Sequence, residues 1–436
     1  MSTMGRLAAA LADADPIRVN GRIKEVVGLV VVSQGPPVAY GELCHIQRGP
    51  GLPPVRAEVV GFDGGLVKLM PIDDVAGLRP GLEVVATGAP LTVPVGEGLL
   101  GRVLDAVGEP LDGKPLPPGL KFRPVMAAPP NALTRTRISQ PLGLGIRAID
   151  GPLTVGRGQR VGVFSGSGVG KSTVMGMIAR YTEADINVIG LVGERGREVR
   201  EFIERDLGEE GLKRSVVVVA TGDQRPLLRL RASFTATTIA EYFRDRGKDV
   251  LLMVDSITRF ARAQREVGQT VGEPPSTRGY TPSVFAILPV LLERTGTAAK
   301  GSITALYTVL VEADDMNEPV ADTVRGILDG HIVLSRDLAN RGHYPAVDVL
   351  GSVSRCMPEI TPAEQRAAAR KLQRTIAVYR DAEDLINIGA YVAGSSPDID
   401  YAIRKKPMID AYLQQGITES VPLADSVTQL QTLMAD

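Results

Sequence analysis

The stretch V-G-V-F-S-G-S-G-V-G-K-S-T, residues 161–173, decides the fold. Apolar residues suited to a buried strand lead into a glycine-rich run, and Met175 and Ile178 then follow at helical spacing. This order of strand, tight turn and helix start is that of a phosphate-binding loop. Its glycines let backbone N–H groups approach a polyphosphate, and the helix N-terminus adds partial positive charge. A nucleotide site is therefore predicted here.

The loop residues have separate expected roles. Lys171 would reach the β- and γ-phosphates, and the Ser172 hydroxyl would be a ligand of Mg²⁺. The generic motif begins with a glycine at the position where this chain has Ser165. The predicted nucleotide-binding residues of the loop are Gly166, Ser167, Gly168, Val169, Gly170, Lys171, Ser172 and Thr173.

Composition indicates a multidomain globular chain of a reducing compartment. Its 436 residues predict two or three domains with a large core. Lys+Arg number 49 and Asp+Glu 50, so no global positive charge indicates nucleic-acid binding. Cys44 and Cys356 stand far apart, with no spacing suited to a metal or a disulfide. The N-terminus is a poor signal peptide, and the apolar runs fall short of the roughly 20 residues of a membrane span, which predicts a cytoplasmic chain.

The N-terminal part is expected to form a short helix followed by β-structure. Residues 1–16 suit an amphipathic docking helix or a frayed terminus, and both interpretations stay open. Over residues 17–92, short apolar runs alternate with Gly/Pro turns, which predicts a small closed β-barrel of five or six strands. Tyr40 and Phe62 are the aromatics of this region, too few for the stacking platform of an RNA-binding barrel.

Residues 93–345 carry the periodicity of a nucleotide-binding domain. A proline-rich connector over 110–130 comes first, and helical stretches then lie between most of the predicted strands. The strands are expected at 160–164, 187–192, 215–220, 250–254, 303–308 and 331–334. Right-handed crossovers give a mostly parallel sheet with its ligand at the carboxyl ends of the strands. The predicted fold class is an α/β P-loop (RecA-like) core with an N-terminal small β-barrel and a C-terminal helical bundle.

Two later strand ends carry acidic residues. L-L-M-V-D at 251–255 places Asp255 at the end of an apolar strand, where a carboxylate can hold Mg²⁺, usually through water. V-G-E-R-G-R-E at 192–198 places Glu194 at the tip of the strand that follows the loop. A carboxylate there can orient and polarise the attacking water near the γ-phosphate.

Residues 346–436 are expected to hold the end of the nucleotide domain, to about residue 360, and a helical C-terminal domain. Thr361, Pro362 and Glu364 form the pattern of a capping box at a helix start. Two further helical segments are predicted over 399–404 and 407–415.

Several motifs, in order, resemble those of the catalytic subunits of the F/V-type ATPase superfamily. They are G-S-G-V-G-K-S-T at 166–173, G-E-R-G-R-E at 193–198, L-L-M-V-D-S at 251–256 and the signature P-A-V-D-V-L-G-S-V-S-R at 345–355. Within the superfamily, S-G-S-G at 165–168 and R-T-R-I-S-Q-P-L-G-L-G-I-R-A-I-D at 135–150 resemble the type III export ATPases, flagellar or virulence-associated. The R-E-G-N-D pattern of the rotary β subunit is absent after Arg195. The flagellar branch is favoured.

This resemblance implies roles for the matching residues. Lys171 would bind phosphate, Ser172 and Asp255 would hold Mg²⁺, and Glu194 would activate the attacking water. Lys171, Glu194 and Asp255 are therefore implied to be catalytic residues.

Two more residues match positions that complete the site. Tyr344 matches the aromatic that stacks on adenine, and Arg355 matches the arginine finger that a neighbouring subunit inserts. A guanidinium placed there is worth roughly 10³–10⁵ in rate. Supplied by a neighbour, it completes the active site only in a closed ring.

The resemblance also implies a homohexamer that hydrolyses Mg-ATP and drives protein export. Expected partners are a coiled-coil negative regulator at the N-terminus, a central coiled-coil stalk protein, export chaperones with cargo, and a membrane export gate bound peripherally. The loop at 268–282 would face the central hole of the ring, and no nucleic-acid partner is expected. The alternatives are a catalytic subunit of a rotary ATP synthase, an RNA-translocating ring ATPase, and a nucleotide-binding scaffold without turnover.

Overall fold

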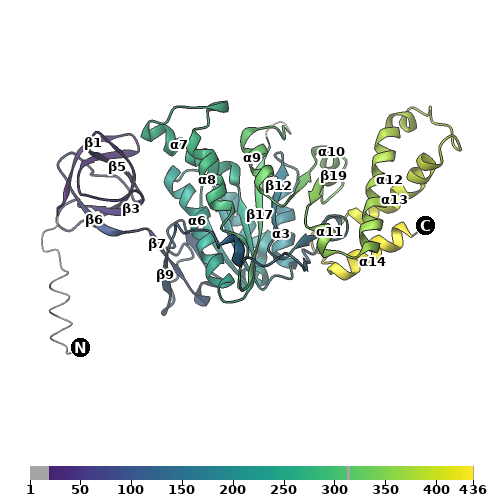
Figure 1. The fold of residues 1–436 in the computed structure, drawn as a ribbon, viewed down its shortest axis with the longest axis horizontal. Coiled ribbons are helices and arrows are strands. Elements are labelled where there is room, and N and C mark those ends of the chain that lie inside the picture. The colour runs from purple at the N-terminus through teal and green to yellow at the C-terminus, as the bar shows by residue number, and fades with distance from the viewer. Residues whose placement is uncertain (1–18, 312–314, 436) are drawn as a thin grey trace. The chain divides into compact units, whose positions relative to one another are not determined.

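The computed structural model describes residues 19–311 and 315–435, which form two compact units. One unit runs to Leu91 and includes residues 270–273, and the other holds the rest of the described chain. The helix expected over residues 1–16 lies outside the described residues. Figure 1 shows the elements within each unit.

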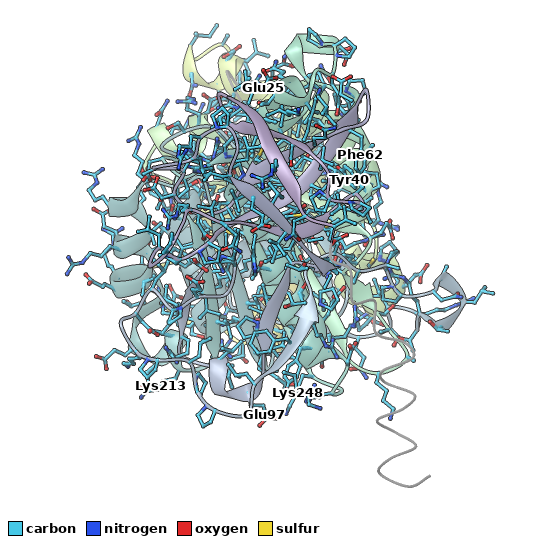
Figure 2. All side chains as sticks on the ribbon, turned by 90° about the vertical axis from the view of Figure 1, so that its left-hand side faces the viewer. Glu25, Tyr40, Phe62, Glu97, Lys213 and Lys248 are labelled. Carbon is cyan, nitrogen blue, oxygen red and sulfur yellow. The ribbon has the colours of Figure 1, made fainter. Side chains whose placement is uncertain are left out.

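The first unit is a closed six-stranded barrel, as predicted. Its strands are β1 Gly21–Val27, β2 Val30–Gln34, β3 Glu42–Ile46, β4 Val55–Asp63, β5 Leu66–Pro71 and β6 Glu83–Pro90. They follow the order β1-β2-β5-β4-β3-β6, and antiparallel pairing of β1 with β6 closes the barrel. Tyr40 and Phe62 are 74% and 54% exposed on this unit (Figure 2), so neither aromatic belongs to the barrel core.

A nine-stranded sheet forms the core of the second unit. Its main path has the order β19-β18-β12-β17-β15-β13-β14-β8, and β16 pairs with β17. The strands are β8 Val103–Asp105, β12 Arg160–Ser165, β13 Ile186–Val192, β14 Ser215–Ala220, β15 Asp249–Asp255, β16 Gly296–Thr297, β17 Ser302–Leu310, β18 Gly330–Leu334 and β19 Val347–Ser354. All six strands predicted for this domain are present, and pairing is parallel except for β16 and β19.

Smaller elements precede and flank this sheet. The predicted proline-rich connector contains β9 Lys121–Pro124, which pairs with β7 Thr92–Val95, and β10 Pro141–Leu142 pairs with β11 Val155–Gly156. The helices of the domain are α2 Arg147–Asp150, α3 Lys171–Tyr181, α4 Gly196–Glu201, α5 Gly208–Lys213, α6 Pro226–Arg244, α7 Ile257–Val271, α8 Pro282–Leu292, α9 Pro319–Ile327, α10 Arg336–Asn340 and α11 Met357–Ile360. Almost every residue of α6 is buried, because this helix packs on β13, β14 and β15.

The C-terminal helices are α12 Ala363–Asn387, α13 Pro397–Leu413 and α14 Leu423–Met434. The predicted capping box is wrong: the Thr361 hydroxyl instead donates to the Met357 carbonyl at 2.7 Å, and α12 begins after Pro362 without a side-chain cap. The two helices predicted over 399–404 and 407–415 are one helix, α13, which continues through Pro407. Burial of Ala402 and Ile409 on either side of this proline offsets the hydrogen bond that it cannot donate. No helix of the described residues is long and apolar enough to cross a membrane.

Candidate functional site

The phosphate-binding loop joins β12 to α3 at the carboxyl edge of the parallel strands. Gly168 and Gly170 have φ values of 79° and 87°, a left-handed conformation that glycine adopts without steric cost. Gly170 precedes the first turn of α3, so the free N–H groups of Lys171 and Ser172 lie at the loop. Ser165, which replaces the first glycine of the motif, is the last residue of β12 and has no positive φ. This position therefore does not require glycine.

Both predicted carboxylates lie beside the loop lysine. The Lys171 ammonium donates to Asp255 Oδ1, and its Nζ lies 3.7 Å from Glu194 Oε1. Thr308, on the neighbouring strand β17, donates to the same Asp255 oxygen at 2.6 Å. The parallel strands β13 and β15 are paired so that Leu191 lies opposite Asp255, which brings their carboxyl ends together. The sequence prediction that these groups converge is consistent with this geometry.

Glu194 is 8% exposed, and its Oε1 accepts no hydrogen bond from the described residues. Burial, and next the negative charge of Asp255, raise the pKa of the Glu194 carboxyl to about 7, while Lys171 opposes the rise. A carboxyl with a pKa near neutrality ionises and accepts protons at working pH, which is the requirement for a general base. Its position and chemistry suit the activation of a water molecule.

Arg259 belongs to this cluster, and the sequence analysis missed it. Its Nη1 donates to the Gly193 carbonyl at 2.6 Å, and its Nε lies 3.3 Å from Glu194 Oε1. Gly193 has a φ of 73°, and a Cβ there would stand 2.6 Å from Arg259 Cδ, so only glycine fits against this side chain. A sequence signal for Arg259 was available: it lies in the first turn of α7, the helix that follows the strand ending at Asp255.

Tyr344 is half-exposed. Its ring lies beside the phosphate loop, because a Cβ built on Gly170 would be 3.5 Å from it. Its carbonyl accepts a hydrogen bond from the Gln415 N–H at 3.0 Å. The buried Gln415 side chain donates to the Gly145 carbonyl at 2.7 Å and accepts from the Arg147 N–H at 2.9 Å. The segment between α13 and α14 is thus attached beside Tyr344, a long-range contact with no local sequence signal.

The residues present fit Mg²⁺ bound together with a nucleotide. Ser172 lies exposed in the first turn of α3, and Asp255 supplies a carboxylate at the neighbouring strand end. In the described part of the chain, no three His, Cys, Asp or Glu side chains form a metal-binding group. Protein Mg²⁺ sites at phosphates use one or two protein ligands plus phosphate and water, so this small oxygen set is sufficient.

Arg355 lies away from this cluster, at the opposite edge of the sheet. β19 runs antiparallel to β18, so Ser354 pairs with Gly330 at the amino end of β18. The Arg355 N–H donates to the Asp329 carbonyl at 3.0 Å, and Asp329 in turn bonds Arg160 at the start of β12. The five residue steps of β12 cover roughly 16 Å, further than an arginine side chain extends. Within one chain, therefore, Arg355 does not reach the phosphate loop.

Comparison with known families agrees with this architecture. Residues 145–354 match the nucleotide-binding domain of the ATP synthase alpha/beta family, and residues 23–88 match its beta-barrel domain. Residues 361–432 match the C-terminal domain of the T3SS EscN ATPase. The barrel, the sheet and the terminal helices thus correspond to three matched domains.

Individual relatives are similar over almost the whole chain. The Flagellum-specific ATP synthase of Bacillus subtilis is 58% identical, with 96% of each chain covered. The assembled ATPase EscN of the enteropathogenic E. coli type III secretion system is 45% identical, with a TM-score of 0.90 over 95% of this chain and 100% of that one. EscN in complex with its central stalk EscO is 44% identical, with a TM-score of 0.87 over the same shares.

Proposed function

This chain belongs to the ATP synthase alpha/beta family and, within it, to the type III export ATPases, and we propose that it hydrolyses Mg-ATP between the subunits of a homohexamer. The observation that carries the proposal is that one chain holds the catalytic residues in two separate places. Lys171, Glu194 and Asp255 converge on one edge of the sheet, whereas Arg355 lies at the other. A head-to-tail ring brings the two edges together at every interface.

The residues of this chain would divide the reaction among them. The loop N–H groups and Lys171 would hold the β- and γ-phosphates, and Ser172 and Asp255 would hold Mg²⁺, which when bound would neutralise charge on the phosphate oxygens. Glu194 orients the attacking water and takes its proton, and Arg259 fixes the carboxylate. Water enters in line with the leaving diphosphate, so the bond to the γ-phosphorus forms as the bridging bond breaks.

The remaining groups would position the nucleotide and stabilise its transition state. Tyr344 stacks on adenine beside the loop. Arg355 of the adjacent subunit stabilises negative charge on the equatorial oxygens, and its absence from an isolated chain predicts a slow monomer. The ring is therefore expected to be the active form.

The biological setting proposed is a flagellar export apparatus. The flagellar relative from Bacillus subtilis is 58% identical over 96% of this chain, against 53% over 92% for the SPI-2 type 3 secretion system ATPase of Salmonella typhimurium. By analogy with the EscN–EscO complex, a coiled-coil stalk would occupy the ring centre. A coiled-coil regulator at the N-terminus, cargo with its chaperones at the C-terminal helices, and peripheral attachment to the inner-membrane export gate complete the proposal.

The test is a mixing experiment with two inactive proteins. Arg355→Ala keeps an intact phosphate loop, and Lys171→Ala keeps an intact Arg355. Mixed rings are expected to regain ATP hydrolysis, because some interfaces combine the intact loop of one variant with the intact arginine of the other. Phosphate release is measured across mixing ratios. Absence of hydrolysis at every ratio, with mixed rings verified by native mass measurement, would contradict a site shared between subunits.

A further inference from the structure

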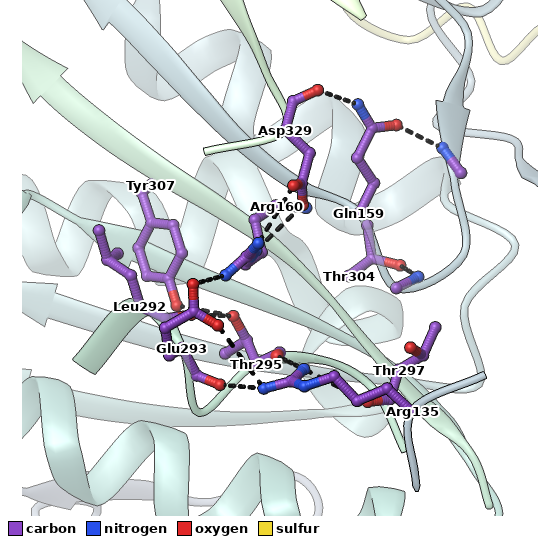
Figure 3. Close-up of polar contacts among 12 residues, drawn as sticks. Arg135, Gln159, Arg160, Leu292, Glu293, Thr295, Thr297, Thr304, Tyr307 and Asp329 are labelled. Carbon is purple, nitrogen blue, oxygen red and sulfur yellow. Dashed lines mark hydrogen bonds and ion pairs between the residues drawn. The ribbon is translucent and has the colours of Figure 1, made fainter. Parts of the chain in front are cut away.

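A network of ion pairs lies at the sheet edge that carries Arg355. Arg160, the first residue of β12, donates to Asp329 Oδ2 from Nε at 3.0 Å and to Asp329 Oδ1 from Nη2 at 3.1 Å. Its Nη1 donates to Glu293 Oε1 at 2.5 Å. Figure 3 shows the Arg160 guanidinium between the two carboxylates and Arg135 bonded to the Glu293 carbonyl.

The same network anchors the backbone of Arg355. The Asp329 carbonyl accepts from the Arg355 N–H and from Gln159 Nε2, each at 3.0 Å. Gln159 Nε2 also donates a hydrogen bond to Ser354 Oγ at 3.2 Å. The Asp329 N–H donates to the Arg160 carbonyl at 2.9 Å, and the Arg160 N–H donates back to Asp329 Oδ2 at 3.1 Å. Asp329 thus joins the start of β12 to the backbone of Arg355, and Gln159 joins Asp329 to Ser354.

The Arg355 guanidinium, in contrast, has no hydrogen-bond or ion-pair partner within residues 19–311 and 315–435. It lines a cavity of about 500 Å³ together with Arg160, Asp329 and Glu293. The carboxylates of Asp329 and Glu293 line the same cavity and would attract a free guanidinium, but Arg160 engages both of them. The third carboxylate of the cavity, on Glu359, is exposed, and the Glu293 side chain is 43% exposed, so water and salt screen both of them more than Asp329, which is 27% exposed.

Arg160 is well suited to keep these two carboxylates occupied. Burial lowers the pKa of the Arg160 guanidinium, but the hydrogen bonds and charges of Asp329 and Glu293 outweigh this effect and raise it. The fork of the guanidinium meets Asp329 with two parallel bonds, the geometry of a strong pair. The pair persists at any physiological pH.

We propose that Arg160 is a positioning residue for Arg355: by engaging Asp329 and Glu293, it leaves the Arg355 guanidinium free to enter the nucleotide site of the next subunit. The inference rests on the proposed function, since it requires Arg355 to act on a neighbour. It also links two sites in one chain. β12 begins at Arg160 and ends at Ser165, directly before the phosphate loop, so one strand connects the loop to the anchor of the donated arginine.

The first variant is Arg160→Gln, which removes the guanidinium from Asp329 and, among the described residues, leaves Glu293 with only Arg135, whose Nη2 lies 3.8 Å from Glu293 Oε2. The two carboxylates are expected to capture Arg355, lowering kcat by roughly 10²-fold, the effect of a small misplacement of a reacting group. The KM for ATP stays unchanged, because Arg355 acts in the transition state. The second variant combines Arg160→Gln with Asp329→Asn and Glu293→Gln. Among the described residues of the cavity, only the exposed carboxylate of Glu359 then remains, and solvent screens it, so kcat recovers to within a few-fold of wild type. A merely structural loss of bonds would instead make this triple variant worse.

Mixing separates this inference from the proposed function. Arg160→Gln is expected to regain activity with Lys171→Ala, which donates a correctly held Arg355, and to stay inactive with Arg355→Ala. A misfolded variant would be rescued by neither. Wild-type kcat in Arg160→Gln, an inactive triple variant, or activity in the mixture with Arg355→Ala would each overturn the inference. If Lys171→Ala and Arg355→Ala fail to complement each other, the proposal of a site shared between subunits is refuted as well.

Discussion

The carboxyl of Glu194 gives hydrolysis an expected pH dependence. Burial and the charge of Asp255 raise its pKa to about 7, against the opposing charges of Lys171 and Arg259. The proposed role needs the ionised carboxylate, so the rate rises with pH. With this pKa, about a tenth of the carboxyl is ionised at pH 6 and about nine-tenths at pH 8, which predicts a rise of about tenfold.

The assay is phosphate release followed from pH 5.5 to 9. The relevant quantity is kcat/KM, because its pH dependence reports groups of the free enzyme. Excess Mg²⁺ keeps the ionisation of the substrate constant, and sedimentation at each pH verifies that the ring stays assembled. Glu194→Gln is the control: it is expected to bind ATP at every pH and to hydrolyse it at none.

A second variant tests the cause of the shift. Arg259→Met removes a positive charge that lowers the pKa of Glu194, so the rising limb should move to higher pH. A flat kcat/KM between pH 6 and 8 with intact rings would refute the assignment of Glu194 as the titrating base. If Arg259→Met instead moved the rising part of the kcat/KM profile to lower pH, the electrostatic explanation would be refuted.

Two further predictions concern nucleotide affinity and stability. Tyr344→Ala should raise the KM for ATP roughly tenfold, since losing a base–aromatic stack costs ~1–3 kcal/mol, and Tyr344→Phe should preserve the KM in the same assay. Glu241→Gln should lower the free energy of unfolding by about 3–5 kcal/mol in urea titrations, because it leaves a buried guanidinium without its counter-charge. That guanidinium belongs to Arg294, which is 0% exposed and donates to both oxygens of Glu241, at 2.9 and 2.6 Å. Glu210→Gln, in an exposed pair with Lys213, should leave the unfolding midpoint unchanged.

Much of the fold was predictable because its signals are local. The phosphate loop fixed a strand and a helix start, and apolar runs of strand length gave all six predicted strands of the sheet. Asp255 and Glu194 were predicted to converge because the carboxyl ends of parallel strands share one edge. β1 has no apolar run of its own to mark it in the sequence, because Gly21 and Ile23 are its only buried residues and its pattern is otherwise that of an exposed segment.

The missed contacts depend on residues that are distant in sequence. Gln415 reaches Gly145 across 270 positions, and Arg160 reaches Asp329 across 169. Neither spacing leaves a periodic trace, so only the folded chain reveals them. The capping box failed for a related reason: Thr361 had two local partners available, and it closed the preceding turn of α11.

The placement of the loop and of Arg355 at opposite edges of one sheet also has an evolutionary consequence. In the proposed ring, a single gene encodes both faces of every interface. A substitution on either face is inherited by all interfaces at once, and no partner gene can compensate for it. Selection therefore acts on how well the chain matches itself, and lineages that diverge on one edge must diverge on the other.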